Sequence, residues 1–288
     1  MSVTVYAPAK INLSLDIVGT RADGYHLLES IFQSVSIGDT IVVRKRWRKG
    51  IALDAPGCNC PTEKNTAYKA AAAFMAYTQL NKGVAISLHK EIPQQAGMGG
   101  GSADAAGVLV ALNKLFNTNL TTEQLCEIGL SVGADVPFCI VGGTAYVTGI
   151  GEKIQPLPPL PPCYIVIAQP SEGISTKEAY AAVDNAEILA RPDNTAAIAA
   201  LEAGDLPGVC RQAINVFESA TELAGVADIR RRMEQFNPLC SQMTGSGSCV
   251  FAVFEDEKLA KACLAALEKD YPNAVVCVPC GGIDIPFA

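Results

Sequence analysis

A dense cluster of glycines in the middle of the chain is the first pattern that could support chemistry. Gly97, Gly99, Gly100 and Gly101 stand within five positions and lead into a segment whose apolar residues recur at helical spacing. Backbone amides without side chains in front of them, beside the unpaired N–H groups of a helix's first turn, form a concave set of donors suited to phosphate. A flexible turn that only packs tightly is the alternative, and the helix directly behind the glycines favours the phosphate cradle.

This glycine loop differs from two common nucleotide-binding patterns. No Gly-Lys-Ser/Thr follows it, so it is not a Walker loop, and Ser102 stands where the third glycine of a dinucleotide fingerprint would be. The loop alone therefore indicates a phosphate without indicating which nucleotide carries it.

A strand near the N-terminus presents one entirely polar face. Apolar and polar residues alternate from residue 10 to 17, and the polar positions are Lys10, Asn12, Ser14 and Asp16. Such alternation is typical of an antiparallel sheet with one solvated face. The same face could instead line a cleft, and the pattern leaves both possibilities open.

A single acid stands among apolar and helix-breaking residues in the segment Gly-Ala-Asp-Val-Pro-Phe, 133–138. An isolated carboxylate in such surroundings is unfavourable unless it has a partner or a task. Asp135 is therefore the candidate general base, and an acid that merely caps the turn explains it about as well.

Two further positions could contact a planar ligand. Tyr25 and His26 end the turn-rich loop 19–26, where an aromatic ring and an imidazole could stack on a base and hydrogen-bond to it. A surface loop with an incidental aromatic is an equal alternative. Asn65 precedes the apolar segment 67–79, where it is a natural helix cap whose amide could also face the glycine loop.

Periodicity predicts the elements that must position these residues. We expect a strand at 84–88, a helix from about 102 to 116 with Asp104 as a first-turn acid, and a helix at 121–130 that opens with a capping box. Five prolines within 156–162 predict a domain boundary, because proline continues neither a helix nor a central strand. The predicted domains are residues 1–155 and 163–288. In the second we expect strands at 164–168, 249–254 and 274–278, helices at 176–183, 194–203, 206–220, 225–235 and 257–269, and a glycine-rich loop at 242–248.

Composition restricts the class of partner. Hydrophobic residues make up 49% of the 288, charged residues 18%, and the formal net charge is −7, which favours a small-molecule partner over nucleic acid or an anionic membrane. Five cations surround the single tryptophan in 44–49, and we interpret this run as a solvated hairpin end. We expect a cytoplasmic protein, because no apolar run approaches the roughly 18 residues of a membrane span and no signal pattern opens the chain. The 11 cysteines follow no zinc-site spacing, so we expect free thiols and no structural metal.

Three segments together resemble the three motifs of the GHMP kinases, which phosphorylate small alcohols with ATP and magnesium. They are 8–13 (Pro-Ala-Lys-Ile-Asn-Leu), 97–104 (Gly-Met-Gly-Gly-Gly-Ser-Ala-Asp) and 244–247 (Thr-Gly-Ser-Gly). The segments 21–26 and 133–138 resemble one branch of the family, which phosphorylates the 2-hydroxyl of 4-diphosphocytidyl-2-C-methyl-D-erythritol in non-mevalonate isoprenoid synthesis. The motifs span nearly the whole chain, which makes an accidental resemblance improbable.

The resemblance implies a fold and its departures are small. It implies an α+β protein of two domains, an N-terminal domain like ribosomal protein S5 domain 2 and a ferredoxin-like C-terminal domain, with the active site between them. Met98 stands where a leucine is usual and keeps the apolar character. Ala103 stands where a second serine is usual, which places one phosphate or metal contact in doubt.

The resemblance also implies roles for particular residues. Asp135 would accept the proton of the substrate hydroxyl, and Lys10 would keep that carboxylate ionised and offset charge on the transferred phosphoryl group. The residues implied for ATP are Asn65, Pro93, Gln94, Gln95, Ala96, Gly97, Met98, Gly99, Gly100, Gly101, Ser102 and Ala103. Those implied for the cytidine diphosphate substrate are Asn12, Tyr25, His26, Thr176 and Tyr180. ATP and Mg²⁺ are the implied co-substrate and cofactor, no residue is assigned to the metal, and a monomer or weak homodimer is expected.

Two alternatives remain at the level of sequence. One is another kinase of the same family that acts on homoserine or mevalonate, which needs no cytidine-binding residues. The other is a catalytically silent relative that binds nucleotide, against which the presence of both Lys10 and Asp135 argues.

Overall fold

The first sheet is built around two very long antiparallel strands. The computed structural model describes residues 1–58, 60–221 and 223–284. In it β1 (Ser2–Thr20) pairs with β2 (His26–Arg46) along almost its whole length, with register shifts near Pro8, Asn12 and Ile17. The sheet order is β3-β4-β2-β5-β6, with β1 attached to β2. The remaining strands are β3 (Gly50–Asp54), β4 (Gly83–His89), β5 (Thr144–Gly149) and β6 (Lys153–Pro156).

The chain between β2 and β3 is not the hairpin end that we expected. β4 lies between these two strands, antiparallel to β2 and parallel to β3, so β2 and β3 do not pair. The cation-rich connection is nevertheless solvated, since Trp47 is fully exposed.

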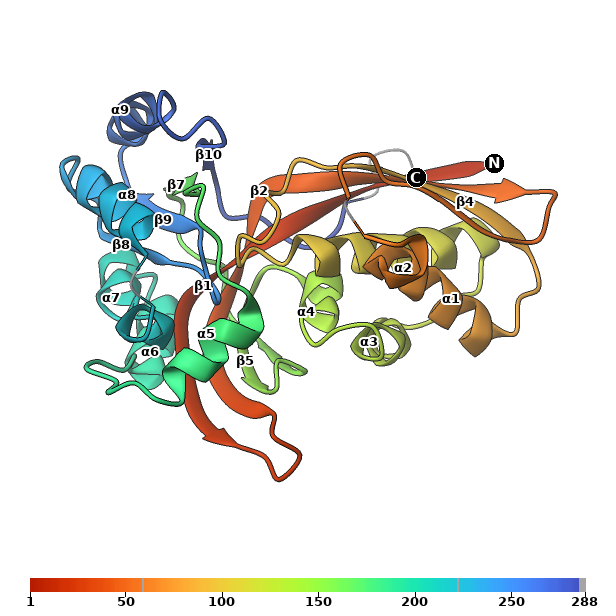
Figure 1. The fold of residues 1–288 in the computed structure, drawn as a ribbon, viewed down its shortest axis with the longest axis horizontal. Coiled ribbons are helices and arrows are strands. Elements are labelled where there is room, and N and C mark those ends of the chain that lie inside the picture. The colour runs from red at the N-terminus through yellow and green to blue at the C-terminus, as the bar shows by residue number, and fades with distance from the viewer. Residues whose placement is uncertain (59, 222, 285–288) are drawn as a thin grey trace.

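Four helices cover one face of this sheet (Figure 1). They are α1 (Thr66–Thr78), α2 (Gly100–Phe116), α3 (Thr122–Leu130) and α4 (Val136–Val141), and a short 3₁₀ helix, η1 (Thr62–Lys64), precedes α1. The predicted cap of α1 is confirmed, because the Asn65 side chain accepts a hydrogen bond from the Ala67 amide at 2.9 Å. The capping box between Thr121 and Gln124 is also confirmed.

α2 begins two residues earlier than the sequence indicated. Gly99 occupies the N-cap in the left-handed conformation with φ 71°, so the helix starts at Gly100 and its first turn contains no acid. Asp104 therefore lies in the second turn, where it is buried against the sheet instead of standing at the helix end. Almost the whole circumference of α2 is buried, which explains its richness in alanine, since small residues allow close packing on both sides.

The second sheet has the order β10-β7-β9-β8 and carries its own helices (Figure 1). Its strands are β7 (Tyr164–Ala168), β8 (Cys240–Met243), β9 (Val250–Phe254) and β10 (Val275–Cys277). Its helices are α5 (Thr176–Val183), α6 (Asn194–Glu202), α7 (Leu206–Arg211), α8 (Ala224–Glu234), α9 (Glu257–Leu267) and the 3₁₀ helix η2 (Val216–Ser219). In sequence, the last strand of the first sheet ends at Pro156 and the first strand of the second begins at Tyr164. The domain limits at residues 155 and 163 stay a prediction.

Two predictions in this half were wrong. Residues 206–220 do not form one helix, because α7 ends at Arg211 and the Asn215 side chain turns back to donate to the Met243 and Gly245 carbonyls at 2.8 and 2.9 Å. β8 was missed because its four residues run directly into the glycine-rich loop and resemble part of it.

The polar face of β1 is not solvated. Lys10, Asn12, Ser14 and Asp16 are between 1% and 7% exposed, because the second half of the chain packs over them. The Ser14 hydroxyl donates to the side-chain Oδ1 of Asn194 at 2.6 Å, and the Arg191 guanidinium donates to the Asp16 Oδ1 at 2.5 Å. The interpretation that the polar face lines a cleft therefore holds for Lys10 and Asn12, whereas Ser14 and Asp16 are covered by Asn194 and Arg191. Among the described residues, no helix combines the length and the apolar character needed to cross a membrane.

Candidate active site

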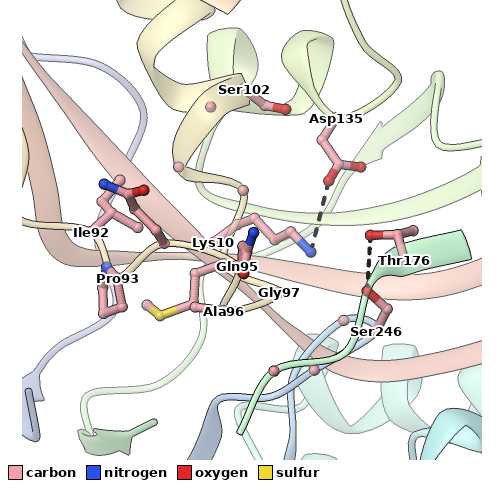
Figure 2. Close-up of a pocket in the computed structure, with 18 of the residues that line it drawn as sticks. Lys10, Ile92, Pro93, Gln95, Ala96, Gly97, Ser102, Asp135, Thr176 and Ser246 are labelled. Atoms are coloured by element: carbon pink, nitrogen blue, oxygen red, sulfur yellow. Dashed lines mark hydrogen bonds and ion pairs between the residues drawn. The ribbon is translucent and has the colours of Figure 1, made fainter. Parts of the chain in front are cut away.

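A cavity of about 1100 Å³ opens between the two halves of the molecule. Its wall contains Lys10 and Asn12 of β1, the whole segment 93–102, Asp135 before α4, the segment 173–176 and the glycines of 245–247. Figure 2 shows these groups converging from segments that are far apart in sequence. Two residues of the polar strand face, the glycine loop and the isolated acid thus line one cavity.

Lys10 and Asp135 meet at this cavity. The Lys10 Nζ lies 3.9 Å from the Asp135 Oδ2, and Figure 2 marks this ion pair. The Lys10 side chain is 5% exposed whereas that of Asp135 is 33% exposed, so the carboxylate remains accessible to a ligand in the cavity. Asp135 occupies the N-cap position of α4 but makes no side-chain cap bond, so the alternative that it merely caps the turn is wrong.

The Lys10 ammonium is held from several sides. It donates to the Asn12 Oδ1 at 2.7 Å and lies 4.8 Å from the centroid of the Phe32 ring. Asn12 is fixed in turn, because its Nδ2 donates to the Ser30 hydroxyl at 2.9 Å and its backbone N–H donates to the Thr244 hydroxyl at 2.9 Å. A buried ammonium held by oxygen acceptors on a rigid strand is well placed to stabilise negative charge that develops beside it.

The glycine loop is held in place by hydrogen bonds to its carbonyls. The Met98 carbonyl accepts from the Lys10 N–H at 3.1 Å, and the Ala96 carbonyl accepts from the Cys249 N–H at 3.3 Å. Within the described parts of the chain, the amides of Gly97, Met98 and Gly99 donate to no other residue. They are donors available to an anion at the head of α2, where the helix dipole also favours negative charge.

The two glycine-rich loops interlock. A β-carbon added to Gly97, which has φ +72°, would lie 2.1 Å from the Thr244 carbonyl oxygen, and one added to Gly245 would lie 2.8 Å from the Gly97 carbonyl oxygen. On the far side of the second loop the Ser246 and Thr176 hydroxyls are 3.3 Å apart (Figure 2). Both loops therefore require glycine because backbone meets backbone there.

An aromatic group closes the end of the cavity nearest α5. The Tyr180 ring lies 4.6 Å from the His26 ring and 5.0 Å from the Phe217 ring, measured between centroids. Burial, with a smaller contribution from the Asp135 charge, raises the pKa of Tyr180 to about 12, so its hydroxyl is a neutral donor at physiological pH. His26 is also held by Asp184, whose Oδ1 lies 2.7 Å from the His26 Nε2.

Most of the residues assigned from sequence line the cavity, and three do not. Asn65, Thr176, Tyr180 and all ten residues from 93 to 102 are in its wall. Ala103 is not, because it is fully buried, and its part in the nucleotide site stays a prediction. Tyr25 is 61% exposed on the β1–β2 turn, and His26 reaches the cavity only through its contact with Tyr180. The expected part of Tyr25 and His26 in substrate binding stays a prediction.

Sequence reasoning missed a charged cluster behind the glycine loop. Lys90 donates to the Asp104 Oδ2 at 2.6 Å and to the Asp39 Oδ2, and the Asp39 Oδ1 accepts from the amides of Glu91 and Ile92 at 2.7 and 2.9 Å. Burial and the neighbouring Asp39 raise the pKa of Asp104 to about 7, although the Lys90 charge opposes this. These residues are separated by up to 65 positions, so only the fold brings them together. Other unassigned residues in the wall include Phe32, Cys58, Cys60, Lys64, Thr66, Phe217 and Ser246.

The described residues contain no group of three or more histidine, cysteine, aspartate or glutamate side chains that could hold a metal ion. All eleven cysteines are free thiols.

Comparisons with known proteins agree with this architecture. The family model described as the GHMP kinases N terminal domain matches residues 65–143, and that of the GHMP kinases C terminal matches residues 197–273. The 4-diphosphocytidyl-2-C-methyl-D-erythritol kinase of Clostridium tetani is 42% identical over 94% of this chain and 98% of its own length. That of Carboxydothermus hydrogenoformans is 44% identical over 89% of this chain and 90% of its own.

Solved structures extend the comparison to the fold. A crystal structure of 4-(cytidine 5′-diphospho)-2C-methyl-D-erythritol kinase has a TM-score of 0.82 at 32% identity and covers 97% of this chain and all of its own. Homoserine kinase from Cytophaga hutchinsonii has a TM-score of 0.77 at 20% identity, covering 98% and 96%, which shows the shared fold alone. The expected α+β, two-domain architecture is confirmed. The chain belongs to the GHMP kinase family, whose members are ATP-dependent phosphotransferases that act on small-molecule alcohols.

Proposed function

We propose that this kinase transfers the γ-phosphoryl group of ATP to the 2-hydroxyl of 4-diphosphocytidyl-2-C-methyl-D-erythritol. The observation that carries the proposal is the Lys10–Asp135 pair, which stands in one cavity with both the glycine loop and the aromatic group around Tyr180. Relatives at 42% and 44% identity that bear the name of this kinase support the choice of substrate.

The chemical step needs little beyond positioning and charge. The substrate oxygen attacks the γ-phosphorus, the bond to the bridging β–γ oxygen breaks, and ADP leaves with that oxygen. Asp135 accepts the hydroxyl proton, for which its partly exposed carboxylate is available. Lys10, whose ammonium lies 3.9 Å from that carboxylate, offsets the negative charge on the phosphoryl oxygens during the transfer.

The nucleotide occupies the side of the cavity formed by the glycine loop. The amides of Gly97, Met98 and Gly99 receive phosphate oxygens, and the Ser102 hydroxyl in the cavity wall provides a further contact. Asn65, which caps α1 in the same wall, lies beside the base.

Magnesium fits this donor set only together with ATP. Mg²⁺ typically uses one or two protein oxygens and completes its shell with phosphate oxygens and water. The cavity offers such oxygens in Ser102 and Asp135, and the described chain holds no preformed cluster of metal ligands. When bound, the ion would neutralise charge on the β- and γ-phosphates.

The cytidine end of the substrate occupies the opposite side. Tyr180 offers a ring for stacking, with Thr176 and Asn12 in the same wall as hydrogen-bonding groups. The His26 ring packs against the Tyr180 ring, and Tyr25 is exposed on the β1–β2 turn. The roles of Tyr25 and His26 in cytidine binding remain predictions.

A comparison of acceptors tests the proposal. Purified protein with ATP and Mg²⁺ is offered the cytidine diphosphate alcohol, homoserine and mevalonate in separate reactions, and ADP formation is measured. We expect kcat/KM for the cytidine diphosphate alcohol to exceed the other two by at least about a thousandfold, since a site built to bind a missing group discriminates strongly. Equal turnover of homoserine or mevalonate would favour another kinase of the family, and ATP binding without turnover of any acceptor would favour the silent relative.

A further inference from the structure

Asp39, Lys90 and Asp104 form a buried cluster, here called the acid–lysine cluster, behind the glycine loop. Lys90 donates to both carboxylates, and the side chains are 12% exposed for the lysine, 0% for Asp39 and 4% for Asp104. The three residues come from three elements, since Asp39 belongs to β2, Lys90 follows β4 and Asp104 lies in α2.

The cluster connects the two ends of the glycine loop. At the entry, the Asp39 carboxylate accepts from the Glu91 and Ile92 amides, which fixes the chain just before Pro93 to β2. At the exit, Asp104 stands one turn into α2, three residues after Gly101. Lys90 joins these two attachments through one ammonium group.

The cluster lies against the start of α2. A β-carbon added to Gly100 would lie 3.6 Å from the Lys90 Nζ and 3.1 Å from the Ile92 Cγ2. Lys90 and Asp104 also belong to the cavity wall. The ammonium and the first turn of α2 are therefore close neighbours at the cavity wall.

The acid–lysine cluster contains more acidic groups than basic ones. Two carboxylates face one ammonium, and the Asp104 Oδ1 is buried without a hydrogen-bond partner among the described residues. Burying such a group is usually no more stabilising than an apolar replacement of similar volume. A role in fixing geometry therefore explains the cluster better than a contribution to stability does.

We propose that Lys90 is a positioning residue for nucleotide binding: by holding Asp39 and Asp104 together, it sets the separation of the two ends of the glycine loop. The orientation of the phosphate-binding amides depends on that separation. This inference rests on the proposed function, because it takes ATP as the occupant of the loop. It concerns only the nucleotide side of the cavity, so the alcohol side is expected to be unaffected.

Four variants test the proposal. Lys90→Met removes the ammonium, Lys90→Arg keeps a cation that can donate to two carboxylates, and Lys90→Met/Asp104→Asn allows an amide to bond to Asp39 directly. Lys82→Met is the matched control, since Lys82 is exposed before the same strand and is absent from the cavity wall around the glycine loop. Thermal unfolding of each variant identifies any that fails to fold.

Steady-state kinetics gives each variant's KM for ATP, its KM for the cytidine diphosphate alcohol, and kcat at saturation of both. Calorimetry measures the binding of a non-hydrolysable ATP analogue directly. We expect Lys90→Met to weaken both ATP measures by at least about tenfold, while kcat at saturation and the KM for the alcohol stay within about twofold. Lys90→Arg and the double variant should each recover a large part of the loss, and Lys82→Met should equal the unchanged protein.

Other outcomes overturn the proposal. ATP affinity within twofold in Lys90→Met would show that the loop needs no such clamp, and equal losses for both substrates would indicate a general structural defect. A double variant as weak as Lys90→Met would indicate that the ammonium contacts the nucleotide directly. If Lys90→Met does not fold, Lys90→Arg and the double variant alone decide between these results. Failure of the proposed function is separate, since it would leave the binding of the ATP analogue unchanged and abolish only turnover of the cytidine diphosphate alcohol.

Discussion

At the scale of single residues, the structure decides between alternatives that the sequence left open. Alternation alone does not show which face of a strand is covered, so the polar positions of β1 could be solvated or buried. They are buried, and Lys10 reaches Asp135 across 125 positions of sequence. Asp135, the isolated acid of the segment 133–138, has Lys10 as its ion-pair partner, and its role as the general base stays a prediction.

The sequence did not reveal the residues whose partners come from distant parts of the chain. Asp104 was interpreted as a dipole-stabilising acid because local sequence shows only the helix start, and its partners Asp39 and Lys90 come from other strands. Tyr25 and His26 were identified by residue type, neither is part of the cavity wall, and their part in substrate binding stays a prediction.

The buried carboxyl of Asp104 is expected to make the folding stability depend on pH. Its pKa in the folded chain is raised to about 7, mainly by burial, so between about pH 4 and pH 7 the folded state binds a proton that the unfolded state has lost. The groups that face it are Asp39, Lys90 and Cys58. Folding stability at this site is therefore present below the unfolded pKa and is lost as the pH rises toward 7.

Asp104→Asn should remove this dependence. The free energy of unfolding of both proteins is measured with urea at pH 5 and pH 8. We expect the value for the variant, relative to that of the original chain, to rise by on the order of 2 kcal/mol from pH 5 to pH 8. A constant difference in unfolding free energy across this range would contradict a titrating carboxyl at this position.

At the scale of elements, regular segments were predicted well and their junctions less well. α5 matches the expected range, and β4, α1 and α3 agree within one or two residues, because periodicity is clear over a whole helix or strand. The break after α7 depends on a distant contact, the bonds from Asn215 to the second glycine loop, which no local pattern reveals. The pairing of β3 with β4 instead of β2 is likewise a long-range choice.

The contact between the two glycine loops gives a prediction at this scale. Gly97→Ala should weaken ATP binding by at least about tenfold and lower the unfolding temperature, because its β-carbon would lie 2.1 Å from the Thr244 carbonyl oxygen and the backbone has φ +72°. The measurement is calorimetric binding of an ATP analogue together with thermal unfolding.

Gly204→Ala is the matched control for that experiment. Gly204 has φ +69°, and nothing lies within 4 Å of an added β-carbon, so this variant carries the cost of the backbone conformation without the crowding. If both variants bound the ATP analogue as the original chain does, contact between the loops would have no part in forming the nucleotide site.

At the scale of the whole molecule, the site exists only where the two halves meet. Lys10, Asp135 and the first glycine loop come from the half that contains the first sheet, whereas Thr176, Tyr180 and the second loop come from the other half. The order of the sequence motifs predicted the fold through a family resemblance. The cavity and the acid–lysine cluster could not be predicted in this way, because they form where segments far apart in sequence pack together (Figure 1, Figure 2).

The measurement that tests the central claim most directly compares the original chain with Asp135→Asn. Transfer of phosphate from ATP to the cytidine diphosphate alcohol is followed by phosphorus NMR, and binding of the ATP analogue is measured on the same samples. The account predicts that the variant loses phosphoryl transfer by about a hundredfold to ten-thousandfold while nucleotide affinity stays within about tenfold. Undiminished transfer by the folded variant would contradict it.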